Sequence, residues 1–306
     1  MKKYIVLCII LMLTLAACST PKDDTSKDKQ TKETRTYKTE SGKEVQVPKE
    51  PKRIAVLTAF YVGDFVKLGH KPVAVPDFVK DSKTLKPHLK DVSFVSADDV
   101  EKIASLKPDL IVVDATDKNI KKFEKLAPTI PYEYNDYKHT EIMKEIGKLV
   151  GEEKAADQWI ADWNKQIKED RKEIEKAVGK STATVFEPDA KTISIFESNW
   201  GRGSDIVNDE YGMPVTKAYQ EKLDEKKEGY ATISKERITD YAGDFILLSK
   251  NNGSTFDFEK TNAWKQLPAV KNDRVITYKG EDYWFNDAIT IEALRKYLKE
   301  EILKRA

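Results

Sequence analysis

Two short stretches in the second half of the chain combine aromatic rings with hydrogen-bonding groups. The first is Asn199-Trp200-Gly201-Arg202-Gly203. Its glycines can take positive φ and hold the side chains between them outward. A tryptophan supplies apolar contact area and a guanidinium donates several hydrogen bonds in fixed directions, so this loop suits a ligand with an apolar body and oxygen acceptors. The alternative is a turn in which Trp200 packs on the core.

The second stretch is Asp282-Tyr283-Trp284-Phe285-Asn286. Three adjacent aromatic side chains cannot easily all face one core, so at least one of them should be exposed or line a pocket. The chain contains no Gly-x-Ser-x-Gly, Walker A or His-Glu-x-x-His sequence, and its carboxylate pair Asp98-Asp99 is typical of a helix cap. We therefore expect a binding protein and not an enzyme.

The stretch from residue 152 to residue 178 must position these loops relative to the rest of the chain. It contains no Gly or Pro, and its apolar residues recur at helical spacing over a charged remainder. One helix of this length would extend about 40 Å. Patterns of alternating strand and helix lie on both sides of it. We expect an α/β protein with two lobes, residues 37–151 and 179–306, joined by this backbone helix; the alternative is a helix inside one large domain.

The strand and helix signals in both lobes predict a specific order of elements. In the first lobe they alternate, which is the pattern of a parallel sheet with crossover helices. Gly69 is expected to end a helix, and Asp98 or Asp99 and Ser234 are expected to cap two others. Residues 280–286 are expected to be a loop. The predicted strands are 44–47, 53–57, 73–75, 109–113, 129–132, 182–186, 192–196, 245–248 and 274–278, and the further helices are 60–68, 100–106, 117–126, 205–211, 234–241 and 288–304.

The N-terminus is typical of a secreted, lipid-modified protein. Lys2 and Lys3 precede an apolar run over residues 5–15, and Leu15-Ala16-Ala17-Cys18 resembles a bacterial lipobox. We expect residues 1–17 to be a signal peptide, Cys18 to be diacylated and residues 18–36, which are poor in hydrophobic residues, to form a disordered tether. A plain signal peptide or a membrane helix is the alternative, although the run is short for a membrane span.

Composition limits the other classes of partner. The net charge is +1 with Lys and Glu evenly mixed, which argues against nucleic acid. Cysteine occurs at positions 8 and 18 alone, so the folded body has no disulfide, thiol nucleophile or Cys metal site. The histidines are His70, His88 and His139. A direct zinc or manganese site would gather several of them with carboxylates.

Two further motifs carry a family resemblance. Pro51-Lys52-Arg53-Ile54-Ala55-Val56-Leu57, together with Glu101-Lys102-Ile103-Ala104-Ser105-Leu106-Lys107-Pro108-Asp109-Leu110-Ile111, resembles the paired signature of ABC-importer substrate-binding proteins for iron chelates, heme and cobalamin. The resemblance covers about residue 37 to the C-terminus and implies two lobes bridged by a long helix, the periplasmic-binding-protein-like fold. The two aromatic stretches are similar to those of the ferric-hydroxamate-binding lipoproteins of Gram-positive bacteria.

That resemblance implies roles for individual residues. Trp200 and Trp284, with neighbouring Tyr283, would pack on the chelate, and Arg202 would donate to hydroxamate oxygens. The remaining residues match positions in the first-lobe cleft or at the permease-docking rim: Tyr134 and Tyr61 as cleft aromatics, and Glu101 and Glu236 as a pair that docks onto arginines of the permease. From charge alone, the two glutamates are equally well interpreted as favourable charges at helix N-termini.

The expected function follows from these residues together. It is that of a monomeric receptor, anchored by lipid on the extracellular face of the cell membrane, which binds an iron(III)-siderophore complex between its lobes and delivers it to an ABC importer. No cofactor is expected, because the iron chelate is the ligand. Heme, another iron chelate or a directly bound metal remains the alternative cargo.

Overall fold

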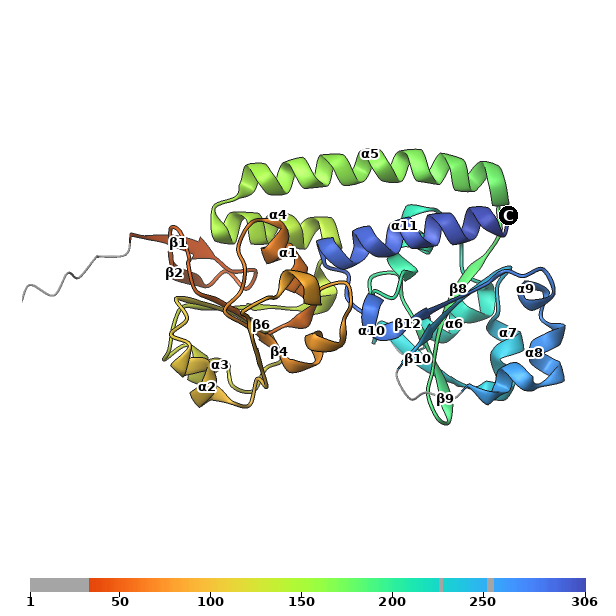
Figure 1. The fold of residues 1–306 in the computed structure, drawn as a ribbon, viewed down its shortest axis with the longest axis horizontal. Helices are drawn as coiled ribbons and strands as arrows, with labels where there is room; N and C mark the ends of the chain where they lie inside the picture. Colours follow the sequence, from red (N-terminus) through yellow and green to blue (C-terminus); the bar gives the residue numbers. More distant parts are fainter. Residues whose placement is uncertain (1–32, 226–227, 252–255) are drawn as a thin grey trace, which may run out of the picture. The chain divides into compact units, whose positions relative to one another are not determined.

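Two five-stranded sheets and a long helix organise the part of the chain that the computed structural model describes, residues 33–225, 228–251 and 256–306 (Figure 1). The signal peptide, Cys18 and most of the expected tether lie outside the described residues. A hairpin of β1 (Thr34–Lys38) and β2 (Glu44–Pro48) comes first. The last residues of the tether expected over 18–36 therefore belong to a strand, because Thr34 to Thr36 pair with Gln46 to Pro48.

The first lobe contains a fully parallel sheet, as the alternating pattern predicts. Its strand order is β5-β4-β3-β6-β7, and its central strand has all three residues buried, as expected where both faces are covered. The strands are β3 (Ile54–Val56), β4 (Ala74–Pro76), β5 (Ser93–Val95), β6 (Leu110–Asp114) and β7 (Thr129–Tyr132), and the α-helices are α1 (Val62–Lys67), α2 (Val100–Ser105), α3 (Ile120–Phe123) and α4 (His139–Val150). Four 3₁₀ turns complete the lobe: η1 (Ala59–Tyr61), η2 (Asp77–Asp81), η3 (Lys86–His88) and η4 (Tyr134–Asp136).

In this lobe the local sequence signals predict helix ends correctly where a capping residue is present. They fail where a side chain forms a hydrogen bond with the backbone that replaces the helical one. Asp99 accepts a hydrogen bond from the Lys102 amide at 3.0 Å, and Gly69 has φ +84°, so both expected helix ends are confirmed. The helix predicted over 117–126 is wrong in extent, since α3 has only four residues. The Asp117 side chain instead accepts from the Asn119 amide at 2.7 Å and forms a local turn.

The backbone helix α5 (Glu153–Val178) is confirmed within one residue of its predicted start. Trp159 and Trp163 stack on its buried face with ring centroids 5.6 Å apart. Gly147 of α4 allows α4 and α5 to approach closely, since a Cβ there would lie 2.6 Å from the Ala156 Cβ. Further along, the buried Asp170 pairs with Arg295 and Lys299 of the C-terminal helix α11 (Ala288–Lys304).

The second lobe has a mixed sheet in the order β10-β9-β8-β11-β12. Strands β8, β11 and β12 are parallel, and β9 is antiparallel to both of its neighbours, β8 and β10. The strands are β8 (Ala183–Pro188), β9 (Thr192–Phe196), β10 (Tyr230–Ser234), β11 (Phe245–Lys250) and β12 (Val275–Lys279). The helices are the π-helix η5 (Asp205–Glu210), α6 (Lys217–Asp224), η6 (Lys235–Arg237), α7 (Ile238–Tyr241), η7 (Asp257–Lys260), α8 (Asn262–Gln266), α9 (Pro268–Lys271), α10 (Gly280–Tyr283) and α11 (Ala288–Lys304).

Three details of this lobe differ from the sequence prediction. Residues 280–286 begin with the short helix α10 and are not wholly a loop. Ser234 ends β10 and its side chain makes no capping hydrogen bond, so the helix expected over 234–241 is divided into η6 and α7. The helix expected over 205–211 is present but wound as a π-helix, with i→i+5 hydrogen bonding.

The two lobes touch directly as well as through α5. Residues 33–306 form one compact unit. Asp64 of α1 accepts from the Ala288 amide at the start of α11 at 3.0 Å, and the Lys83 amide donates to Asp282 at 2.9 Å. Within the described ranges no helix is long and apolar enough to cross a membrane.

Candidate functional site

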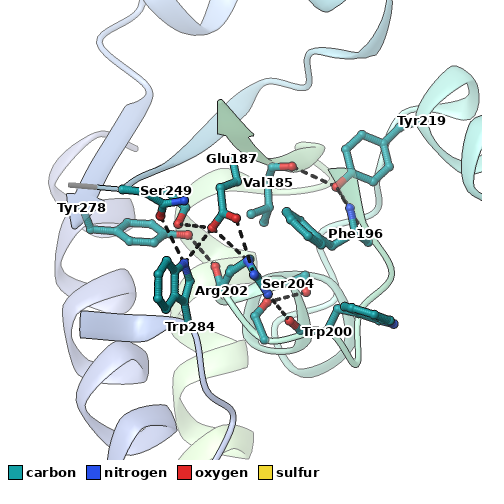
Figure 2. Close-up of polar contacts among 12 residues, drawn as sticks. Val185, Glu187, Phe196, Trp200, Arg202, Ser204, Tyr219, Ser249, Tyr278 and Trp284 are labelled. Atoms are coloured by element: carbon teal, nitrogen blue, oxygen red, sulfur yellow. Dashed lines mark hydrogen bonds and ion pairs between the residues drawn. The ribbon is translucent and has the colours of Figure 1, made fainter. Parts of the chain in front are cut away.

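The carboxylate of Glu187, near the carboxyl end of β8, gathers three donors from three different segments (Figure 2). Its Oε2 atom accepts from Arg202 Nε at 2.9 Å, from Trp284 Nε1 at 2.9 Å and from Ser249 Oγ at 3.1 Å. The Glu187 side chain is 13% exposed, so these charge-assisted hydrogen bonds are made largely out of water. One acidic residue thus fixes the two aromatic stretches next to each other.

Arg202 occupies a strained loop that only its flanking glycines allow. Gly201, Arg202 and Gly203 have φ values of +73°, +56° and +85°, which confirms the expected left-handed glycines. A Cβ on Gly201 would lie 2.4 Å from the Trp284 carbonyl oxygen. The loop therefore packs closely against the second aromatic stretch, and the Tyr278 hydroxyl donates to the Arg202 carbonyl.

The Arg202 guanidinium is anchored but keeps donors to spare. Besides Nε, its Nη1 donates to the Trp200 carbonyl at 3.0 Å and its Nη2 to Glu187 Oε1 at 3.5 Å, and the group lies 4.4 Å from the centre of the Phe196 ring. With respect to the described residues, these contacts use three of the five N–H bonds of a guanidinium. Two N–H bonds of the guanidinium therefore make no hydrogen bond to the described residues.

The Trp200 side chain is partly buried. Its indole lies against Gly229, where a Cβ would be 1.7 Å from Nε1, and its ring is 5.1 Å from that of Tyr230. Tyr134 of the first lobe meets the same indole edge-on at 5.6 Å. The Trp200 N–H has no hydrogen-bond partner among the described residues. The ring is therefore partly buried among aromatic neighbours from both lobes.

The first lobe contributes aromatic rings to the same place. The Tyr134 hydroxyl donates to the Asn199 carbonyl at 3.2 Å, and its ring lies 3.9 Å from Phe60. Burial raises the pKa of the Tyr134 hydroxyl, so it stays a neutral donor. The charge of Arg202 acts to lower that pKa and the charge of Asp205 to raise it. We call Phe60, Tyr134, Trp200 and Tyr230 the aromatic row.

The other residues named from the sequence have different positions. Tyr61 is 2% exposed and packs edge-on against Tyr132, in the core of the first lobe. Tyr283 stacks on Tyr297 of α11 with centroids 5.9 Å apart. Glu101, in the first turn of α2, and Glu236, in η6, are both exposed, one on each lobe.

A direct metal site finds no support in residues 33–225, 228–251 and 256–306, which hold no group of three or more His, Cys, Asp or Glu side chains able to bind an ion. His139 is buried, with its ring 5.0 Å from Trp163 and its Nε2 atom 3.3 Å from Glu210. His70 lies near Glu152, and His88 is an exposed residue of η3.

Sequence reasoning missed Glu187 and Phe60. Each follows a predicted buried strand, and ligands of α/β proteins bind outside the carboxyl ends of strands, so an acidic or aromatic residue there was a usable signal. Ser249 also follows a predicted strand, but it is neither acidic nor aromatic, and its contact depends on β11 lying beside β8. Pocket volume would not have identified this site either, because a pocket of about 480 Å³ is lined by other residues, among them Phe196 and Lys217.

A family model described as periplasmic binding protein matches residues 54–281. The chain belongs to this family. It is 34% identical over 302 residues to the iron(3+)-hydroxamate-binding protein FhuD of Bacillus subtilis, covering 97% of this chain and 96% of the relative. The confirmed fold class is thus that of a periplasmic binding protein with one long backbone helix.

Two solved structures resemble this periplasmic binding protein over most of its length. The FhuD protein from S. pseudintermedius is 39% identical with a TM-score of 0.82, covering 89% of this chain and 98% of that one. FhuD2 from Staphylococcus aureus with bound ferrioxamine B is 38% identical with a TM-score of 0.79, covering 83% and 99%. These relatives are binding proteins, as expected here, and not enzymes. More distant relatives are named as lipoproteins.

Proposed function

We propose that this periplasmic binding protein is a lipid-anchored extracellular receptor that binds ferric hydroxamate siderophores and delivers them to an ABC importer. The observation that carries the proposal is the ion pair of Arg202 and Glu187 beside the aromatic row. The names of the FhuD relatives and the ferrioxamine B bound to the Staphylococcus aureus protein support the same class of ligand.

The ion pair favours a neutral chelate. Three hydroxamates balance the charge of iron(III), whereas catecholate and citrate complexes are anionic. Glu187 neutralises Arg202, so the site has donors for oxygen atoms without a net positive charge that would attract an anion. The two remaining N–H bonds of Arg202 suit hydroxamate oxygens, which carry partial negative charge.

The aromatic side chains cover the apolar arms of such a chelate. We assign ligand contact to Trp200, Trp284 and Tyr134, and add Phe60 because its ring stacks with Tyr134. Tyr61 and Tyr283, which the family resemblance also implies, are assigned to packing behind these residues. Iron is cargo already saturated by the chelate, so the protein needs neither a cofactor nor a direct metal ligand.

Delivery requires an anchor and a docking surface. We assign the anchor to lipid on Cys18, and the docking surface to Glu101 and Glu236, whose exposure on separate lobes supports contact with a permease. Such a receptor acts as a monomer. Carboxylates that become desolvated against arginines of a permease would fix its orientation.

Quenching of tryptophan fluorescence tests the proposed cargo. Purified protein is titrated with a ferric trihydroxamate, a ferric catecholate, ferric citrate and hemin, and its metal content is measured beforehand. We expect saturable quenching at the lowest concentration with the hydroxamate. Tightest binding of hemin or citrate, or stoichiometric metal in the protein without chelate, would contradict the assignment.

A further inference from the structure

A small pocket is lined by charged residues of both lobes. Its volume is about 130 Å³. Lys138 and His139 reach it from the first lobe, and Asp205, Asp209 and Glu210 reach it from the π-helix η5. Because η5 has i→i+5 hydrogen bonds, residues four and five positions apart lie on one face, which places all three carboxylates on the pocket side.

Two of these carboxylates have cationic or hydrogen-bonding partners within the pocket wall. Lys138 Nζ is 3.6 Å from Asp209 Oδ2, and both side chains are largely exposed. Glu210 Oε1 lies 3.3 Å from His139 Nε2 and accepts from Trp163 Nε1 at 3.2 Å. The close cationic contacts of this pocket are therefore made to Asp209 and Glu210, although the charge of His139 also acts on Asp205.

Asp205 is the unsatisfied member of the group. It is 5% exposed, and with respect to residues whose positions the structure describes, its Oδ1 atom accepts only from the neighbouring Ile206 amide, at 2.9 Å. Its Oδ2 atom is buried and has no partner among the described residues. Burial raises the pKa of Asp205 to about 6, although the charge of His139 and the hydrogen bond from the Ile206 amide act to lower it; the charges of Glu210 and Asp209 act in the same direction as burial. A buried acceptor without a donor is costly, so this carboxylate is suited to an incoming cation.

The pocket adjoins the proposed siderophore site. Asn199 and Asn286 line it, and they are next to Trp200 and to the Trp284-Phe285 pair in the chain. The Asn199 carbonyl accepts from Tyr134 Oη and from Asn286 Nδ2 at 3.4 Å, so these groups form the wall between pocket and aromatic row. Tyr134 is within electrostatic reach of both Arg202 and Asp205.

We propose that this pocket receives a primary ammonium group carried on an arm of the ferric hydroxamate, with Asp205 as its counter-ion. The inference rests on the proposed function and narrows it to chelates that end in a free amine. An ammonium fits better than a divalent metal ion, because it needs one close carboxylate and a few acceptors, whereas the described residues offer no three-ligand set.

The test compares ferrioxamine B, which ends in a primary amine, with its N-acetylated form, which has the same iron centre without the charge. Dissociation constants are measured by fluorescence quenching for the wild type, Asp205→Asn and the control Glu221→Gln. Glu221 is an exposed acidic residue of α6 on the same lobe. We expect the wild type and the control to bind the amine form about tenfold or more tighter, and Asp205→Asn to bind both forms alike.

The outcomes separate this inference from the proposed function. Equal affinity of the wild type for both forms overturns the ammonium pocket while leaving siderophore binding intact, and this comparison needs no variant to fold. A preference that survives in folded Asp205→Asn also overturns it. If the wild type binds neither form, the proposed function itself is wrong.

Discussion

Arg202 Nε lies 2.9 Å from Glu187 Oε2, and the same carboxylate oxygen accepts from Trp284 Nε1 at the same distance. The arginine and the tryptophan expected to hold the ligand are therefore held by a residue that the sequence did not single out. Loss of Glu187 would remove a hydrogen bond from each of them, although Trp284 Nε1 also donates to Asn251 Oδ1 at 3.1 Å, and would leave Arg202 with an unbalanced positive charge.

Glu187→Gln should change selectivity more than overall binding. The amide can still accept a hydrogen bond, but it no longer cancels the Arg202 charge. We expect the affinity for ferric citrate to rise relative to that for a neutral ferric trihydroxamate by about tenfold, which corresponds to about 1.4 kcal/mol. Glu259→Gln, which removes a charge paired with Lys250 on the same lobe, is the control. An unchanged ratio in Glu187→Gln would refute the neutral-site argument.

Trp200 and Tyr283 should respond differently to truncation. Trp200→Ala removes a ring of the aromatic row and is expected to weaken ferric hydroxamate binding about tenfold. Tyr283→Ala removes a ring that stacks on Tyr297, so it should lower the thermal midpoint while the dissociation constant stays within about threefold. Titration by fluorescence quenching, with a melting curve for each variant, measures both. If Tyr283→Ala weakened binding and Trp200→Ala affected only the melting temperature, Tyr283 would be the ligand contact and Trp200 the packing residue.

Asp64→Asn should stabilise the protein as pH rises. Burial and the nearby charge of Asp287 raise the pKa of Asp64, and burial raises that of Asp287 to about 6. The folded state thus binds more protons than the unfolded chain, so stability falls as pH rises above the unfolded pKa of about 4. The amide keeps the acceptor for Ala288 without the charge.

Urea unfolding at pH 5 and pH 8 measures the effect of Asp64→Asn. The gain over the wild type should be larger at pH 8, about 1 kcal/mol or more. Asp189→Asn is the contrasting control, because hydrogen bonds from Thr192 and Lys191 lower the pKa of Asp189. That variant should lose about the same stability at pH 5 and at pH 8, because Asp189 is ionised in the folded and the unfolded chain over this whole range. A pH-independent effect of Asp64→Asn would exclude this account.

Replacing Glu101 and Glu236 together by Ala should impair delivery and leave binding intact. Both side chains are exposed and lie outside the aromatic row, so the dissociation constant for the chelate should not change. Removal of carboxylates that pair with permease arginines can cost several kcal/mol at an interface. Uptake of radioactive ferric siderophore by cells, at equal surface level, measures the defect. Wild-type uptake would leave the two glutamates as favourable charges at helix starts.

Cys18→Ala should prevent lipid attachment. The precursor is then expected to stay uncleaved or to be released, because the thiol that receives the diacylglycerol is missing. Detergent-phase partitioning and labelling with a radioactive fatty acid measure the change, with Cys8→Ala as a matched control inside the expected signal peptide. Unchanged partitioning of Cys18→Ala would rule out this anchor.

The long helix and the glycine loop were predictable because local rules determine them. The stretch over 152–178 has one apolar face and no helix breaker, and α5 occupies all but its first residue. Gly201 and Gly203 flank Arg202, and both glycines have the positive φ that their positions predict. For these elements, residues that are close together in the sequence determine the local structure.

The contacts that make the site depend on distant segments and could not be predicted in the same way. Glu187 meets Trp284 only because β8, β11 and β12 are neighbours, and no spacing in the chain encodes that. Tyr61 illustrates the opposite error. Its type and position next to Phe60 fit a cleft residue, but successive side chains of the 3₁₀ turn η1 point in directions about 120° apart, and Tyr61 is buried against Tyr132.

Helix α5 is held against α4 where Gly147 meets Ala156, and against α11 where Asp170 meets Arg295 and Lys299. A large separation of the two lobes would require bending of this continuous helix and loss of the ion pairs of the buried Asp170. Capture of a chelate should therefore involve little reorganisation, and its association rate should approach the limit set by diffusion and orientation.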